Sequence, residues 1–234
     1  MQIHDNVLDA GIFYNQHGGY CIPRSSAHRP AVQKVLHGEV WEPDTIEFIV
    51  SHCGTGDIVH AGTFFGDFLP ALSKGCAPDA KIWAFEPVVE NYRCADITIR
   101  INQLDNVILH NVGLGAQSEE VVMQIANQSG VRLGGASRIA IGPITLEKHM
   151  VEKVKTVAID DVIPDERTIS ILQLDVEGYE QPALSGALKT IMRCRPIIIL
   201  ENVPKGDWIT KNIINLGYKQ EGKLHDNSVF LPKT

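Results

Sequence analysis

The sequence predicts an α/β fold of the doubly wound type, in which helices cover both faces of a mostly parallel sheet. From residue 56 onward, short runs of apolar and β-branched residues alternate with stretches of helical character. Such nearly continuous apolar runs are typical of strands that are buried on both faces between helix layers. The predicted strands are residues 57–62, 81–86, 106–113, 169–175 and 196–202.

The segments that follow the later strands carry helix patterns. A continuous helix is predicted after Gly178, and a second one is predicted from about Ile209 to a terminating glycine at Gly217. The segment KLHDNSVFLPK is predicted to be a final antiparallel strand that follows a turn at Glu221–Gly222. The apolar residues that share one face of the first helix are Leu184, Ala187, Leu188 and Ile191.

Two regions break this alternation and are predicted to be additions to one core domain, which spans residues 56–234. Residues 1–55 are predicted to form an irregular arm followed by one or two helices. Residues 119–160 contain strand-like stretches joined by a long glycine-rich loop, and they are predicted to be an inserted hairpin. Loops of this length inside a compact domain are usually functional.

The composition is that of a globular protein. Of 234 residues, 44% are hydrophobic, and 28 acidic against 21 basic side chains give a net charge of −7. This acidic balance argues against a nucleic-acid partner, and the apolar runs are too short to span a membrane. The five cysteines form no C-x-x-C motif, and the first residues lack the features of a secretory signal. We therefore expect a cytoplasmic protein.

The first predicted strand runs into a glycine turn, AGTFFGD. Gly62 and Gly66 are four residues apart in this turn, and a helix is expected from about Asp67. Small residues let the backbone approach a ligand closely, and the start of a helix offers free N–H groups. The spacing differs from the G-x-G-x-x-G of dinucleotide-binding proteins, which argues against a nicotinamide-dependent oxidoreductase. A tight connection without any ligand would also use two glycines.

An acidic residue ends the second predicted strand. Glu86 lies 20 residues after Gly66, where a carboxylate can accept hydrogen bonds from ribose hydroxyls. A plain surface carboxylate at a strand end is the alternative. Together with the glycine turn, Glu86 indicates a ligand that contains adenosine without a pyrophosphate, and S-adenosylmethionine fits this description.

With these features, the chain resembles the FkbM family of S-adenosylmethionine-dependent methyltransferases from about residue 38 to the C-terminus. The resemblance implies a Rossmann-like class I methyltransferase fold, S-adenosylmethionine as the methyl donor, and O-methylation of a hydroxyl on a small molecule, sugar or glycan. The most specific segment is DVEGYE with its downstream ALSGA. The matching segments are GEVWEPDTIEFI, AGTFFGD, AFEPVVENY, NVILHNVGLG, LQLDVEGYEQPALSGA and RPIIILE.

The resemblance also implies which residues bind the cofactor. Glu86 would hold the ribose, and the strand end Asn111–Val112–Gly113 would flank the adenine. The turn residues Gly62, Thr63, Phe64 and Gly66 would wrap the methionine part of the cofactor. Asp67, which follows the turn, would also contact the cofactor.

His60 departs from the family pattern. Related methyltransferases usually have an acidic residue two positions before the first glycine, and this carboxylate helps to hold the ammonium group of the cofactor. A neutral imidazole can accept one hydrogen bond, whereas a charged one would repel the ammonium. His60 is therefore either a weaker cofactor contact or a strand-end side chain with a backbone partner.

Acidic residues at the ends of the later strands are the candidate catalytic groups. Asp175 is assigned to the cleft, where a carboxylate can take the proton of a hydroxyl aligned with the S–CH3 bond. Glu177 either takes part in catalysis or caps the following helix. Glu201 closes the next strand as a second acid, a substrate ligand or a metal ligand, although a divalent metal is not expected. His225 is a candidate general base from the last strands.

Two arginines flank the glycine pair of the 119–160 insertion. Arg132 and Arg138 are predicted to belong to a lid that binds an anionic or polyhydroxyl acceptor, with a solvated hairpin tip as the alternative. The N-terminal arm is predicted either to cover the acceptor site or to pack against a second subunit, so a homo-oligomer is left open.

The sequence thus predicts a methyltransferase that acts on a small-molecule or saccharide acceptor. A non-catalytic binding or scaffold protein with the same fold is the alternative, and the presence of His60 favours it.

Overall fold

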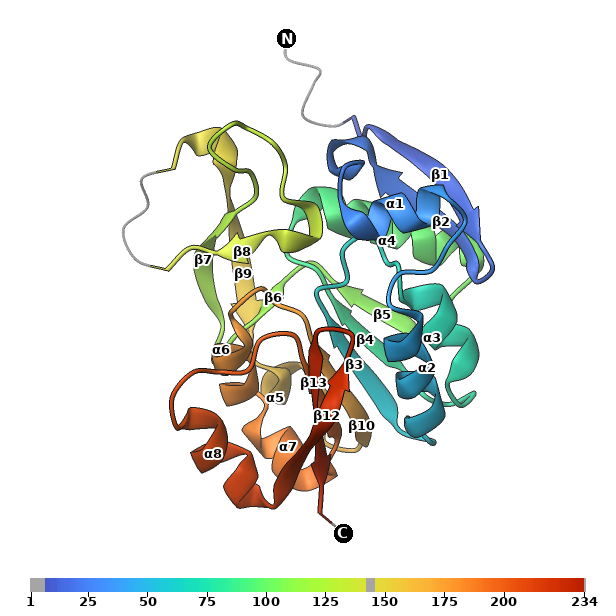
Figure 1. Cartoon of the computed structure of the whole chain (residues 1–234). Helices are drawn as coiled ribbons and strands as arrows, with labels where there is room; N and C mark the ends of the chain where they lie inside the picture. Colours follow the sequence, from blue (N-terminus) through green and yellow to red (C-terminus); the bar gives the residue numbers. More distant parts are fainter. Residues whose placement is uncertain (1–6, 142–145, 234) are drawn as a thin grey trace.

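A seven-stranded sheet lies at the centre of the computed structural model, which describes residues 7–141 and 146–233 (Figure 1). The order of its strands is β12-β13-β11-β10-β3-β4-β5. β11, β10, β3, β4 and β5 are parallel, and β13 is antiparallel to β11 and β12. The predicted Rossmann-like fold, with its antiparallel C-terminal strand, is therefore confirmed. The strands are β3 (Asp57–Ala61), β4 (Ile82–Phe85), β5 (Val107–His110), β10 (Ile169–Leu174), β11 (Ile197–Leu200), β12 (Tyr218–Leu224) and β13 (Asn227–Pro232).

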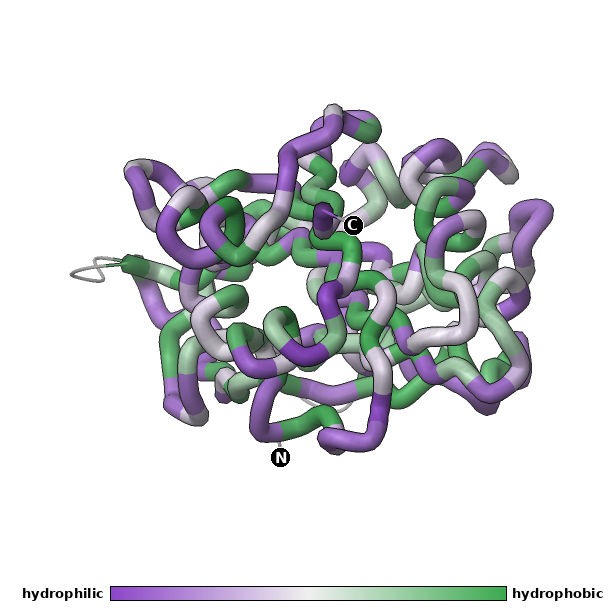
Figure 2. The backbone as a smooth tube through the Cα atoms, turned by 90° about the horizontal axis from the view of Figure 1, so that it is seen from below, coloured by the Kyte–Doolittle hydropathy of each residue, from purple (hydrophilic) through white to green (hydrophobic). Residues whose placement is uncertain are grey.

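Helices cover both faces of this sheet because successive strand residues point to opposite sides. Ile58 packs with the helices on one face, and its neighbour Val59 packs with those on the other. Both side chains are fully buried, and burial of each contributes on the order of 2 kcal/mol. In Figure 2 the outer turns are mostly hydrophilic. The first face carries α2 (Pro43–His52) and α3 (Leu69–Gly75), and the second carries α5 (Ile159–Val162), α6 (Glu180–Ser185), α7 (Leu188–Cys194) and α8 (Trp208–Asn212).

The N-terminal segment is a β-hairpin, so the prediction of an irregular arm is wrong over the described residues. β1 (Ala10–Asn15) pairs with β2 (Gly18–Pro23), and α1 (Pro30–Leu36) and α2 follow. β2 lies on α4 (Val89–Asn102), where the Cys21 N–H donates to Thr98 Oγ1 at 3.0 Å. This packing partner is distant in the sequence, so the local pattern did not reveal it. Residues 1–6 of the predicted arm lie outside the described residues.

The predicted insertion forms a small second sheet. β7 and β9 form an antiparallel pair at its centre, and β6 and β8 are its edges (Figure 1). Residues 142–145 of the predicted insertion lie outside the described residues. The strands are β6 (Gly113–Leu114), β7 (Glu119–Gln124), β8 (Arg138–Ile139) and β9 (Val151–Val157). The short 3-10 turns of the described residues are Arg24–Ser26, Gly134–Ala136, Lys148–Met150 and Ile214–Leu216.

The continuous helix predicted after Gly178 is wrong, because the chain breaks into α6 and α7. The backbone at Gly186 lies so close to Gly115 that a Cβ would come 2.1 Å from the Gly115 carbonyl oxygen. The Asp160 carboxylate then accepts the N–H groups of Lys189 and Thr190 at 3.0 and 2.8 Å. These bonds satisfy the free donors at the start of a new helix.

The predicted turn at Glu221–Gly222 is also wrong. The last two strands turn at His225–Asp226, and the register of β12 shifts between Gln220 and Gly222. The extra residue at this position forms a bulge. Within the described residues, no helix is both long and apolar enough to cross a bilayer.

Candidate active site

Two adjoining cavities lie at the carboxyl ends of the parallel strands, and Gly62, Gly135 and Asp175 line both of them. The space inside them that a water molecule can occupy is about 40 and 160 Å³. We call the smaller one the first cavity and the larger one the acidic cavity. The other residues of the first cavity are Ala61, Phe85, Glu86, Pro87, Gly113, Leu114, Met123, Gly134, Ser137, Ile139, Val176 and Tyr179. Those of the acidic cavity are Arg29, Pro30, Ala31, Trp41, Glu42, Phe64, Asp67, Glu177, Glu201 and Asp226.

The glycine turn after β3 brings three strand ends together. Gly62 has a φ of +84°, and a Cβ at this position would lie 1.9 Å from the carbonyl oxygen of Asp175. The N–H groups of Gly62 and Thr63 both donate to the Phe85 carbonyl oxygen at 3.2 Å, and the Asp175 N–H donates to Ala61 at 3.1 Å. Glycine is therefore the residue that fits position 62.

Glu86 lies at the end of β4 and is 3% exposed. Its Oε2 accepts the Phe64 N–H at 2.8 Å, and its Oε1 accepts the Val88 N–H at 2.9 Å and the Asn91 amide at 3.4 Å. A carboxylate has about four acceptor positions, so Oε2 can still accept one further donor. Burial raises the pKa of Glu86 to about 8, with these hydrogen bonds acting in the opposite direction.

His60 lies away from both cavities as they are defined by the described residues. Its ring is stacked on Phe68, and its Nδ1 is 2.5 Å from the Gln173 amide oxygen, so Nδ1 carries the proton. Burial lowers the pKa of His60 to about 4, so the ring is neutral. Within the described residues, the His60 side chain therefore lines neither cavity, and its partner is the Gln173 side chain rather than a backbone group.

The remaining predicted cofactor residues divide into two groups. Phe64, Asp67 and Gly113 line the cavities. Thr63 and Gly66 shape the turn, Asn111 donates its amide to the Glu86 carbonyl oxygen at 2.9 Å, and Val112 packs against the hydrophobic core.

Three predicted catalytic carboxylates meet in the acidic cavity. Oxygen atoms of Asp175, Glu177 and Glu201 lie within 4.8 Å of one another. Burial and the neighbouring charge of Glu201 raise the pKa of Asp175 well above its ordinary value, and the same two causes raise the pKa of Glu177 to about 7. Burial, with a smaller effect of Glu42, also raises the pKa of Asp67 to about 7.

Strained backbone surrounds the acidic cavity. Glu42, Phe64 and Glu177 all line it, and their φ angles are +45°, +51° and +53°. Each such conformation costs on the order of 1 kcal/mol or more in a residue that has a Cβ, and such positions concentrate at functional sites. Glu177 therefore faces the cavity from a constrained turn.

The predicted acceptor-binding arginines do not line either cavity within the described part of the chain. Arg132 pairs with Glu90 on α4 at 3.3 Å, and Ser25 of the N-terminal segment donates to the same carboxylate at 2.8 Å. Arg138 is exposed on β8. His225, the candidate general base, lies beside Trp41 in the turn between β12 and β13, and its side chain is 43% exposed. Glu90 thus ties the insertion and the N-terminal segment to α4 above the site.

Comparison with known families decides the assignment. The sequence matches the family model of the methyltransferase FkbM domain over residues 52–218, which is most of the chain. The chain belongs to the FkbM methyltransferase family. This membership supports methyltransferase activity and the use of S-adenosylmethionine in general. None of the curated proteins compared with the chain matches it significantly.

Several solved structures are similar to this FkbM domain. The FkbM methyltransferase from Methylobacillus flagellatus KT is 17% identical with a TM-score of 0.48, over 75% of this chain and 43% of that one. The S-adenosylmethionine-dependent O-methyltransferase from Thermotoga maritima is 14% identical with a TM-score of 0.45, over 89% and 63%. The tRNA (uracil-54, C5)-methyltransferase from Pyrococcus abyssi, in complex with S-adenosyl-L-homocysteine, is 12% identical with a TM-score of 0.47, over 95% and 43%. This chain therefore spans less than half the length of the first and third.

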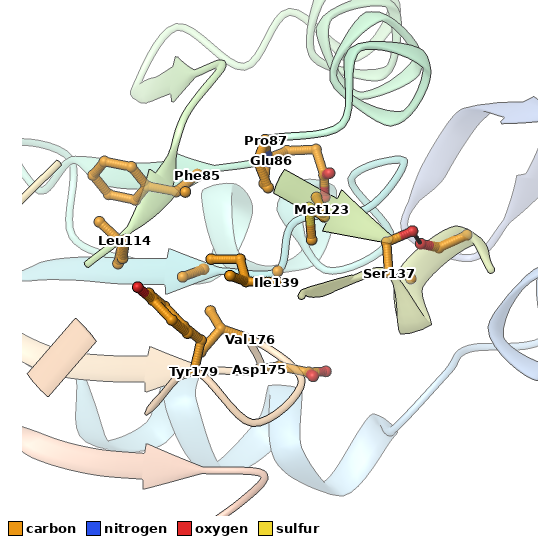
Figure 3. A pocket seen from close by; sticks show the side chains of 15 residues that line it. Phe85, Glu86, Pro87, Leu114, Met123, Ser137, Ile139, Asp175, Val176 and Tyr179 are labelled. Carbon is orange, nitrogen blue, oxygen red and sulfur yellow. Dashed lines mark hydrogen bonds between the residues drawn. The ribbon is translucent and has the colours of Figure 1, made fainter. Parts of the chain in front are cut away.

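Several residues that line the first cavity of the FkbM domain were not predicted from the sequence. Figure 3 shows Phe85, Leu114 and Tyr179 around one part of the first cavity, where they form an apolar wall. Met123 on β7 and Ile139 on β8 line the same cavity, so the small sheet of the insertion covers part of it. The apolar run at residues 121–123 indicated a strand, but nothing local showed that this strand would cover the first cavity.

The raised pKa values of the FkbM domain predict a stability that falls as pH rises from about 6.5 to 8. A carboxyl whose pKa is higher in the folded than in the unfolded state binds more protons when folded, so unfolding becomes easier with rising pH. Below about pH 6.5 the lowered pKa of His60 acts in the opposite direction. We expect Glu177→Gln to reduce the fall in the free energy of unfolding over this pH range by on the order of 1 kcal/mol, after allowance for solvent screening. Urea unfolding at several pH values measures it, with the exposed Glu119→Gln as control. A stability that rises steadily over this range would contradict the expectation.

Proposed function

We propose that this chain transfers the methyl group of S-adenosylmethionine to a hydroxyl oxygen of a small-molecule or saccharide acceptor. The observation that carries the proposal is the meeting of two cavities at Asp175. One cavity has apolar walls and a buried carboxylate, and the other is lined by ionisable groups. A donor in the first and an acceptor in the second would therefore share Asp175 as a neighbour.

The first cavity has the chemistry that adenosine requires. Phe85, Leu114 and Tyr179 offer an apolar wall for the base, and Glu86 Oε2 has an acceptor position left for a ribose hydroxyl. Gly62 exposes backbone without a side chain between the two cavities. These residues would hold the cofactor, which supplies a methyl group on a positively charged sulfur.

Asp175 is the residue placed to handle the acceptor proton. In its ionised form it attracts positive charge in the first cavity and accepts the hydroxyl proton from an acceptor in the acidic cavity. Burial and Glu201 raise its pKa, which makes it a stronger base once it is ionised. Glu177 and Glu201 position it through their negative charge and hold the polar parts of the acceptor.

The position of the new methyl group tests the proposal. The protein is incubated with S-adenosylmethionine carrying a ¹³C-labelled methyl group and with an extract of small molecules from the organism that encodes it. We expect the labelled carbon of the product to give the NMR shift of a methyl ether. A label on nitrogen or carbon would contradict O-methylation while leaving methyl transfer itself intact.

A further inference from the structure

Acidic side chains far outnumber basic ones on the wall of the acidic cavity. Arg29 is the single basic side chain among the described residues that line it. Arg138 lies outside the cavity and, like Arg29, only partly offsets the rise in the pKa of Glu177. Against these stand six carboxyl groups on the wall itself, which belong to Glu42, Asp67, Asp175, Glu177, Glu201 and Asp226.

A buried acceptor bonded to this wall also lacks a donor within the described chain. Asn227 is 2% exposed and donates its amide to Glu42 Oε2 at 2.8 Å, but within the described chain its Oδ1 has no donor. Together with the carboxylates, this acceptor beside the wall would be satisfied by a partner that is positive and rich in N–H groups.

An organic cation accounts for this arrangement better than a metal ion does. The oxygens that converge within 4.8 Å belong to Asp175, Glu177 and Glu201. The other three carboxyl groups lie elsewhere on the wall, which also includes Trp41. A divalent ion held by the first three would leave the rest of this cavity unfilled. A molecule with several polar groups and a protonated amine would fill the cavity and meet more of its charge.

We propose that the methyl acceptor carries a protonated amine beside the hydroxyl that is methylated, as an amino sugar or an amino alcohol does. This inference rests on the proposed function and adds the charge class of its acceptor. The carboxylates of the acidic cavity bind the ammonium, and the hydroxyl faces Asp175. From Arg132 and Arg138 the sequence predicted an anionic or polyhydroxyl acceptor, whereas we propose a cationic one. Arg132 pairs with Glu90, and in the described chain Arg138 lines neither cavity.

The transfer can be followed without knowing the acceptor in advance. The extract is separated by ion exchange at pH 7 into cationic, neutral and anionic fractions, and each is incubated with the protein and labelled methyl donor. We expect the label in the cationic fraction, with a KM for the acceptor that rises with ionic strength. Label in the neutral or anionic fraction overturns the inference but keeps methyl transfer. A protein that binds S-adenosylhomocysteine but labels no fraction overturns the proposed function, and this inference with it.

Single charge removals then locate the site on the protein. Glu201→Gln is expected to raise the KM for the cationic acceptor about tenfold, with the Kd of S-adenosylhomocysteine unchanged. Asp226→Asn should raise this KM only about twofold, because the Asp226 side chain is 91% exposed. The matched control is Glu119→Gln, which removes an exposed carboxylate outside both cavities. Equal KM values in all three variants would contradict the inference. Loss of transfer on addition of EDTA, restored by Mg²⁺, would show that a metal takes this place and would also overturn it.

Discussion

Gly62→Ala is expected to abolish cofactor binding, with at least a hundredfold increase in the Kd of S-adenosylhomocysteine. The added Cβ would lie 1.9 Å from the Asp175 carbonyl oxygen, far inside contact distance, and alanine would also be strained at a φ of +84°. β3 and β10 would have to move apart where the two cavities meet. We expect a cost of about 2–5 kcal/mol in folding stability from the clash and the strain together. Isothermal titration and thermal unfolding measure the two effects.

Gly206→Ala separates backbone strain from the clash. Gly206 has a φ of +77°, and a Cβ there would meet nothing within 4 Å. We expect this variant to lose only about 1 kcal/mol of stability and to bind S-adenosylhomocysteine normally. If Gly62→Ala binds the ligand as well as Gly206→Ala does, the first cavity is not the cofactor site.

Asp175→Asn is expected to lower the rate of methyl transfer by a factor of about 10²–10⁴, the range for loss of a general base. The backbone bond from its N–H to Ala61 does not depend on the side chain, so the fold is retained. The Kd of S-adenosylhomocysteine should change only a few-fold. The wild-type rate should rise with pH because burial and Glu201 raise the pKa of Asp175, and this rise should be absent from the variant.

Asp165→Asn is the control for Asp175→Asn, since it makes the same chemical change at an exposed position. It should leave both the transfer rate and its pH dependence as in the wild type. An Asp175→Asn variant that is slower but keeps the full pH dependence would show that another group takes the proton.

The parts of the fold that follow from local pattern were predictable. The apolar runs ending near Ala61, Phe85 and Leu174 became parallel strands because a strand between two helix layers must be apolar on both sides. The carboxyl ends of such strands share one edge, so Gly62 and Asp175 met there as the sequence suggested. For the same reason Glu86 could be placed at this edge from its position alone.

The features that depend on distant partners were not predictable. The N-terminal hairpin packs on α4 through Thr98, and α6 is separated from α7 by the close approach of Gly115 and the cap from Asp160. Arg132 looked available in the sequence because its partner Glu90 lies on another element. The acidic cavity also went unnoticed as a whole, since Glu42 reaches it from a segment far from the other carboxylates.

The most direct test of the account is titration of the protein with S-adenosylhomocysteine, repeated with Glu86→Gln. We expect one molecule to bind per chain, with a Kd in the range of about 1 μM to 1 mM that is usual for substrate affinities. Glu86→Gln should weaken binding about tenfold, because an amide has one acceptor oxygen where the carboxylate has two. The acceptor position of Oε2 that is free for a ribose hydroxyl would then be lost or displaced. Absence of binding at millimolar ligand, or binding that neither Glu86→Gln nor Gly62→Ala affects, would contradict the assignment of the first cavity to the methyl donor.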